Sequence, residues 1–150
     1  MSKKAITFVE LLIVITIIAI LFSITIVRLK PTFDNLELEN FAKVLYYLTR
    51  YLQASSIRNA EIYYLKIDKE QGILQAFLKN KEEFQNIEGR FGKIYRVPSQ
   101  VIISTEPSQA PGIYFYPDGS INKITITFEN QNKKKVSLNI KGVAGEITIQ

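Results

Sequence analysis

The chain of 150 residues has no histidine, no cysteine and no tryptophan. Without cysteine there can be no disulfide framework, thiolate zinc site, catalytic thiol or lipidated cysteine. Without histidine, the commonest metal ligand and the commonest general base near neutral pH are missing. The sequence also has no glycine-rich phosphate loop and no G-x-S-x-G motif. We therefore expect a protein that is not an enzyme and that holds no metal or other cofactor.

One long apolar run stands at the start of the chain. Between Ile6 and Val27 the only charged residue is Glu10. As a helix these residues reach roughly 33 Å, and a bilayer core is about 30 Å thick. The run has no polar face, so we predict a transmembrane helix at about 6–27. A cleaved secretory signal fits less well, because its apolar stretch is about 7–15 residues and a small-residue cleavage site should follow.

Glu10 is the exception within this run. A carboxylate inside a membrane helix costs about 2.5–3.5 kcal/mol on insertion scales, which makes it a candidate functional residue. The alternative is that Glu10 lies at a shallow depth, roughly 6 Å along the helix from Ile6, and contacts lipid headgroups.

The segment KKAITFVELLIVITIIAIL resembles the signal of type IV pilins and of type II secretion pseudopilins. The resemblance implies a leader at 1–5, cleavage by a prepilin peptidase between Ala5 and Ile6, and N-methylation of Ile6. Ala5 and Ile6 stand where this family usually has glycine and phenylalanine. The resemblance also implies that Glu10 acts in filament assembly, where it would neutralise the new α-amine of a neighbouring subunit.

A second helical pattern follows Pro31. Proline either kinks the helix or ends it, in which case Asp34 and Glu37 would begin a new one. We favour the kink. From Leu36 to Arg58, apolar residues recur at spacings of three and four, which predicts a packing face of Phe41, Val44, Leu45, Leu48, Tyr51 or Leu52, and Ser55. Together with the apolar run, this pattern predicts one N-terminal helix over 6–60.

From residue 61 to 150 the apolar period becomes two and turn residues recur. This pattern predicts short antiparallel strands at Ile62–Ile67, Ile73–Leu78, Ile94–Val97, Val101–Ser104, Ile113–Tyr116, Ile121–Phe128, Val136–Ile140 and Glu146–Ile149. Pro117–Ser120 is a turn in which proline presets φ and glycine accepts a positive φ. The expected fold class is α+β: a long N-terminal helix, transmembrane in its first half, followed by an antiparallel sheet or sandwich.

The segment GIYFYPDGS and the ending KGVAGEITI are similar to pseudopilin H of type II secretion. This likeness implies a minor pseudopilin subunit in a short filament for protein secretion, anchored in the bacterial inner membrane by a single pass with its β domain in the periplasm. Its partners would be the prepilin peptidase, other pilin or pseudopilin subunits and secreted cargo.

Lys133, Lys134 and Lys135 form the only tight basic run and could contact nucleic acid or another anion. The alternative, which we favour, is a solvated hairpin tip. Tyrosine pairs at 46–47 and 63–64, and Tyr114 with Tyr116, could stack bases, but we expect half-buried packing.

Two other functions stay open. One is a minor pilin of a type IV or DNA-uptake pilus whose β domain binds DNA. The other is a membrane-anchored receptor or enzyme that is never cleaved.

Overall fold

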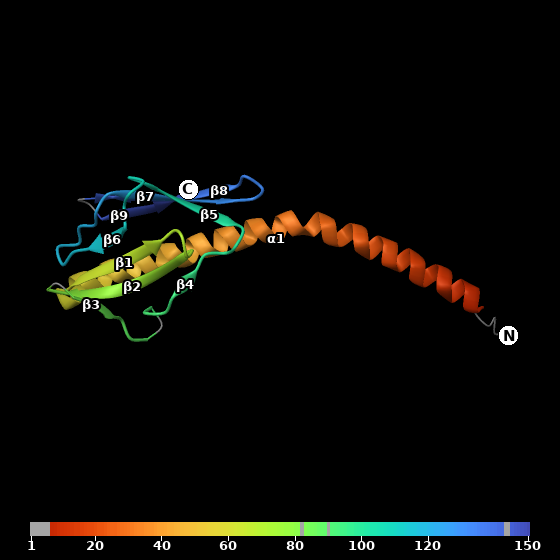
Figure 1. Cartoon of the computed structure of the whole chain (residues 1–150), viewed down its shortest axis with the longest axis horizontal. Helices are drawn as coiled ribbons and strands as arrows, with labels where there is room; N and C mark the ends of the chain where they lie inside the picture. Colours follow the sequence, from red (N-terminus) through yellow and green to blue (C-terminus); the bar gives the residue numbers. More distant parts are fainter. Residues whose placement is uncertain (1–6, 82, 90, 143–144) are drawn as a thin grey trace. The chain divides into compact units, whose positions relative to one another are not determined.

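The computed structural model describes residues 7–81, 83–89, 91–142 and 145–150, without the side chains of 24–29. The described chain forms two compact units, Met1–Phe33 and Asp34–Gln150. One helix, α1 (Phe8–Asn59), makes up the described part of the first unit and continues into the second (Figure 1). The predicted leader, 1–5, lies outside the described residues.

α1 runs through Pro31 without a break. The alternative in which a second helix begins at Asp34 is therefore wrong. Proline removes a single backbone donor, and the neighbouring turns keep their own bonds. The kink that we favoured at Pro31 stays a prediction.

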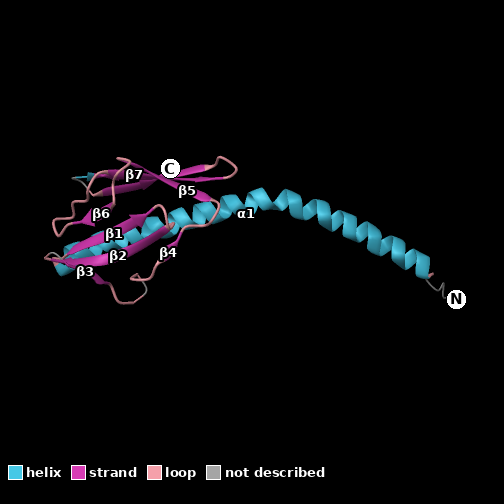
Figure 2. Ribbon diagram, viewed as in Figure 1, coloured by secondary structure: helices cyan, strands magenta, loops and turns pink. Residues whose placement is uncertain are grey.

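In the part of the chain that the structure describes, nine strands follow, and together they form two antiparallel sheets (Figure 2). Their bounds are β1 (Ile62–Asp68), β2 (Ile73–Asn80), β3 (Glu83–Asn86), β4 (Tyr95–Arg96), β5 (Val101–Glu106), β6 (Gly112–Phe115), β7 (Ile124–Asn130), β8 (Lys135–Lys141) and β9 (Glu146–Ile149). The first sheet has the order β3-β2-β1-β6, with β4 also paired to β2, and the second has the order β5-β7-β8-β9. The predicted α+β class is confirmed.

The differences from the predicted strands are local. β3 lies between the predicted strands Ile73–Leu78 and Ile94–Val97, where no strand was predicted, and all four of its residues are exposed. β7 begins at Ile124 instead of Ile121, because Ile121 forms only an isolated bridge with Phe115. β3 was missed because it is an exposed edge strand, on which burial imposes no pattern. The start of β7 was placed too early because Ile121 is buried like a strand residue although it lies outside the strand.

The hydrophobic core belongs entirely to the second unit and extends from Leu38 to Ile147. It joins one face of α1 to the inner faces of both sheets. The largest fully buried side chains are Phe115, Phe128, Leu38, Leu48, Leu52, Leu65, Leu74, Ile113, Ile124, Ile126, Leu138 and Ile140. The second unit therefore has a core of its own, as an independent domain requires.

The predicted packing face of α1 is correct except at Val44. Leu45, Leu48, Leu52 and Ser55 are buried, whereas Val44 is 46% exposed. Val44 fitted the spacing because it follows Phe41 by three residues, yet it projects beyond the edge of the buried stripe.

Candidate assembly site

Glu10 closes the first turn of α1. Its Oε2 accepts one hydrogen bond from the Thr7 backbone N–H at 3.2 Å and another from the Thr7 hydroxyl at 3.3 Å. In return, the Thr7 hydroxyl oxygen accepts a bond from the Glu10 N–H at 3.3 Å. This reciprocal arrangement is a capping box, in which two backbone donors that the helix leaves unpaired gain partners. The T-x-x-E spacing of residues 7–10 signals it, but our reading of the sequence missed it.

The helix surface that follows Glu10 is apolar on every side. Each large apolar side chain from Phe8 to Phe22 is between 47% and 75% exposed. The hydroxyls of Thr16 and Ser23 donate to the carbonyls of Leu12 and Ala19, four residues back, at 2.8 and 3.0 Å. These bonds satisfy the two hydroxyls within the helix. Contiguous exposed apolar surface of this kind marks an interaction site.

Among the residues whose side chains are described, no helix is long and apolar enough to cross a membrane. The predicted span at about 6–27 extends past these residues at Ile6 and at 24–27. Ala5 and Ile6, the predicted cleavage and methylation positions, also lie outside the described residues.

Within the second unit, α1 also has an exposed apolar face. Leu36, Val44 and Tyr47 are 49%, 46% and 67% exposed. Their spacing places Leu36 and Tyr47 on the side of the helix opposite the buried Leu45, with Val44 at the edge of the buried stripe. Nothing in the core of the unit requires these three side chains to be apolar, so they are candidates for contact with another protein.

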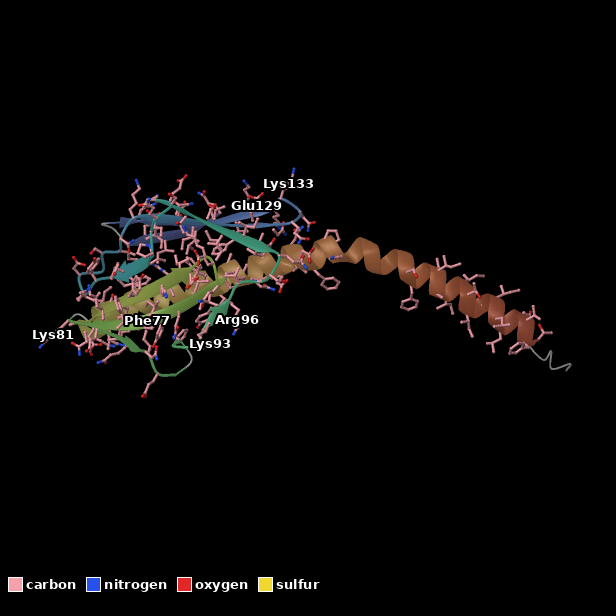
Figure 3. The ribbon with its side chains drawn as sticks, viewed as in Figure 1. Phe77, Lys81, Lys93, Arg96, Glu129 and Lys133 are labelled. Carbon is pink, nitrogen blue, oxygen red and sulfur yellow. The ribbon has the colours of Figure 1, made fainter. Side chains whose placement is uncertain are left out.

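Two of the three lysines in the basic run are occupied by ion pairs. Lys134 pairs with Glu39 of α1, and Lys135 pairs with Glu129 of β7 at 3.2 Å. The bond from Lys134 lowers the pKa of the Glu39 carboxyl. Lys133 occupies the turn between β7 and β8 with a φ of 61° (Figure 3). Because two of its three lysines are paired with carboxylates, the run Lys133–Lys135 is a weaker anion site than its sequence indicates.

The P-D-G-S turn is attached to α1 by side-chain bonds. The Gln53 amide donates to the carbonyls of Gly119 and Gly145 at 3.1 and 3.0 Å. The Ser56 hydroxyl is 3.0 Å from the carbonyl of Tyr116. Gln53, which is not part of the predicted packing face, thus fixes two turns that lie far from it in the sequence.

Asp118 stabilises the same turn from inside. Its Oδ1 accepts bonds from the Ser120 hydroxyl at 2.6 Å and from the Ser120 N–H at 2.9 Å. These two bonds lower the pKa of Asp118 because they favour the charged carboxylate. The role of Asp118 is local, and the described residues contain no cluster of three or more acidic side chains that could hold a metal ion.

Solved structures of other proteins share this fold. No family model matches the chain, and no curated protein sequence matches it. The structure of the minor pseudopilin EpsH from the type 2 secretion system of Vibrio cholerae superposes with a TM-score of 0.67 at 12% identity, covering 76% of this chain and 96% of that one. The chain has a pilin-like fold.

Two further structures agree with this assignment. A second crystal structure of Vibrio cholerae EpsH gives a TM-score of 0.64 at 11% identity, over 75% of this chain and 92% of that one. The type IV minor pilin FimU of Pseudomonas aeruginosa gives 0.62 at 13% identity, over 78% and 90%. Pseudopilin and pilin structures thus match this pilin-like chain about equally well.

Proposed function

We propose that this chain is a minor pseudopilin of a type II secretion system, a structural subunit without catalytic activity. The observation that carries the proposal is the uncovered apolar helix of Phe8–Phe22, which begins at a carboxylate and precedes a unit with its own core. A helix that is apolar all round needs a membrane or other helices to cover it.

The proposed location is the bacterial inner membrane, crossed once, with the β domain in the periplasm. The apolar run of the sequence supports a membrane location. Lys3 and Lys4 before the run are nearly balanced by Arg28 and Lys30 after it, so the charges favour a cytoplasmic start only slightly. Cleavage between Ala5 and Ile6 would remove both lysines and create an α-amine at Ile6, which would then be methylated. The mature subunit would leave the bilayer to enter a short filament.

Glu10 would set the position of one subunit against the next. Both of its bonds to Thr7 use Oε2, whereas a carboxylate has two oxygens and about four acceptor sites. It can therefore hold its own helix start and still accept a bond from the α-amine of a neighbouring subunit. Each charge would lower the cost of burying the other among apolar helices.

The exposed face of Leu36, Val44 and Tyr47 would extend the same contact along the helix. In the filament, these side chains would pack against helices of other subunits. The outer surfaces of the two sheets would remain accessible to other minor subunits or to secreted cargo.

A second candidate is a minor pilin of a type IV or DNA-uptake pilus. The likeness to FimU supports it, because its TM-score of 0.62 is close to the 0.67 of EpsH. In cells that carry either machinery, deletion of the gene separates the two roles. Loss of protein secretion supports the pseudopilin, and loss of pili or of DNA uptake supports the minor pilin.

The capping box allows a sharp test of Glu10. Glu10→Gln keeps a side chain that can cap the helix but removes the charge, whereas Glu10→Ala removes both. We expect both variants to lose incorporation into filaments that are sheared from cells and detected by immunoblot. Glu37→Gln, which changes an exposed carboxylate on the same helix, should be incorporated normally.

Normal incorporation of Glu10→Gln beside failure of Glu10→Ala would show that the helix cap, not the charge, is needed. N-terminal sequencing of the protein from cells provides the independent check. A mature chain that begins at methylated Ile6 is expected. A chain that still begins at Met1 would contradict the proposed function and leave the uncleaved receptor as the better explanation.

A further inference from the structure

The outer face of the first sheet carries a row of aromatic side chains. Tyr64 of β1 lies opposite Phe77 of β2 on one side and opposite Tyr114 of β6 on the other. Their neighbours Leu65 and Ile113 are fully buried in the core. Because side chains alternate between the faces of a strand, the row of three rings lies on the face away from the core.

A fourth ring completes the surface. Phe84, on the edge strand β3, lies 5.1 Å from Tyr64 and 6.2 Å from Phe77 between ring centroids, and it is 47% exposed. The rings of Tyr64 and Tyr114 are 4.5 Å apart with an interplanar angle of 31°. Together with Lys66 and Pro111, these four residues line a groove of about 480 Å³. We call it the aromatic groove.

The floor of the aromatic groove is held in a fixed position. The Tyr64 hydroxyl donates to the carbonyl of Pro111 at 2.9 Å. A Cβ atom on Gly112 would lie 2.7 Å from the Tyr64 ring and 2.2 Å from the carbonyl oxygen of Leu65. Glycine is therefore required there for the ring to lie across β6. Tyr64 is 7% exposed, so its ring forms the buried floor of the groove, whereas Phe84 presents a ring that a ligand can reach.

Lysines stand on both sides of the aromatic row. Lys66 and Lys79 lie two residues beyond Tyr64 and Phe77 on their strands, so both share the outer face. The Lys79 ammonium is 5.3 Å from the centre of the Tyr114 ring. Lys66 pairs with Asp68 at 3.8 Å, and its side chain is 55% exposed. A pair so exposed contributes little energy and can exchange for a ligand.

One more cation extends this surface. Arg96 of β4 lies opposite Ile73 of β2, which lies opposite Asp68 of β1. This register places Arg96 on the same outer face, and Figure 3 labels Arg96 and Phe77 on neighbouring strands of the sheet. Strand register thus places three cationic side chains, Lys66, Lys79 and Arg96, on this face. Among the residues that we place by register, the one carboxylate is that of Asp68.

We propose that the aromatic groove binds single-stranded nucleic acid, with a base stacked on the exposed ring of Phe84 and phosphates near Lys66 and Lys79. Base–aromatic stacking with nearby cations is how sheets bind single strands. A duplex would hide the flat faces of its bases, and an apolar peptide would leave the lysines without partners. The proposal does not depend on the filament role, because binding is a property of the isolated chain.

The test uses the full chain in a non-ionic detergent and a fluorescein-labelled oligomer of twelve thymidines, with binding followed by fluorescence anisotropy. We expect Phe84→Ala to weaken binding at least fivefold, within the range of lost base stacking. We expect Lys66→Gln and Lys79→Gln each to weaken binding and to reduce the slope of log K against log salt by about 0.7.

The matched controls are Tyr47→Ala, which removes an exposed ring from α1, and Lys43→Gln, which removes an exposed lysine from the same helix. Both should bind normally. Thermal melting by circular dichroism identifies variants that do not fold, and if Phe84→Ala is one of them, the two lysine variants decide the question.

Several outcomes would overturn the proposal. The first is absence of binding at low salt. The second is equal affinity for an abasic oligomer or for polyphosphate, which would show charge attraction without stacking. The third is binding that Phe84→Ala and the lysine variants leave unchanged. Displacement of the oligomer by an acidic peptide at equal affinity would assign the groove to a protein partner instead.

Discussion

Leu48 and Tyr47 are neighbours on α1, and we expect replacement by alanine to lower the free energy of unfolding at Leu48 but to leave it nearly unchanged at Tyr47. Leu48 is 1% exposed within the core, whereas Tyr47 is 67% exposed. Leucine-to-alanine changes in a close-packed core cost about 2.7–5.0 kcal/mol, including the cavity that remains. We expect Leu48→Ala to lose about 3 kcal/mol of the free energy of unfolding, and Tyr47→Ala to change it by less than about 0.5 kcal/mol.

The expected change in melting temperature follows from the size of the second unit, because the entropy of unfolding scales with the number of residues. The unit Asp34–Gln150 has about 117 residues, so its unfolding entropy is about 0.25 kcal/mol/K. A loss of about 3 kcal/mol should then lower Tm by about 12 °C. Urea unfolding and thermal melting of the fragment 34–150 measure both quantities.

Incorporation into filaments gives a second test of the exposed helix face. Tyr47→Ala should keep its stability and lose incorporation, because its ring lies on the face proposed to contact other subunits. Equal destabilisation by both variants, or a loss below about 1 kcal/mol for Leu48→Ala, would refute the assignment of the two helix faces. Normal incorporation of Tyr47→Ala would exclude this ring from the subunit contact.

Three further predictions concern the β domain. Gln53→Ala should lower the free energy of unfolding by about 1–3 kcal/mol, since it leaves two turn carbonyls without their donor, and urea titration measures this loss. Lys134→Gln should destabilise the domain above pH 4.5, the ordinary pKa of Glu39. That difference from the native sequence should shrink as the pH of the unfolding experiment falls through the lowered pKa of Glu39, because the pair loses its negative charge there. Ser120→Ala should raise the pKa of Asp118 toward its ordinary 3.8, which NMR titration of the carboxyl group measures.

Much of the fold follows from local pattern. The change of apolar period from about 3.6 to two located the end of α1 and most strands, since a buried face forces that period on the sequence. Pro117–Ser120 predicted a turn, because its residue types suit one backbone path. The strand β3 had no such signal, as all four of its residues are exposed.

Contacts between distant parts of the chain could not be predicted in the same way. Glu39 and Lys134 are 95 positions apart in the sequence, and only the packing of α1 on the second sheet joins them. The aromatic groove likewise needs the register of β6 on β1, which no single segment specifies. The run of three lysines is visible in the sequence as a candidate anion site, whereas Lys66 and Lys79 are 13 positions apart and are brought to one face only by the pairing of β1 with β2.

The two hydrogen bonds that the Gln53 amide donates have a consequence for the order in which the chain folds. Gly145, whose carbonyl accepts one of the two bonds, lies 92 positions later in the sequence. During synthesis, the Gln53 amide can form both bonds only after Gly145 has been added to the chain. A variant chain that stops before Gly145 would therefore keep only the bond from Gln53 to Gly119, so its helix would be held to one turn instead of two.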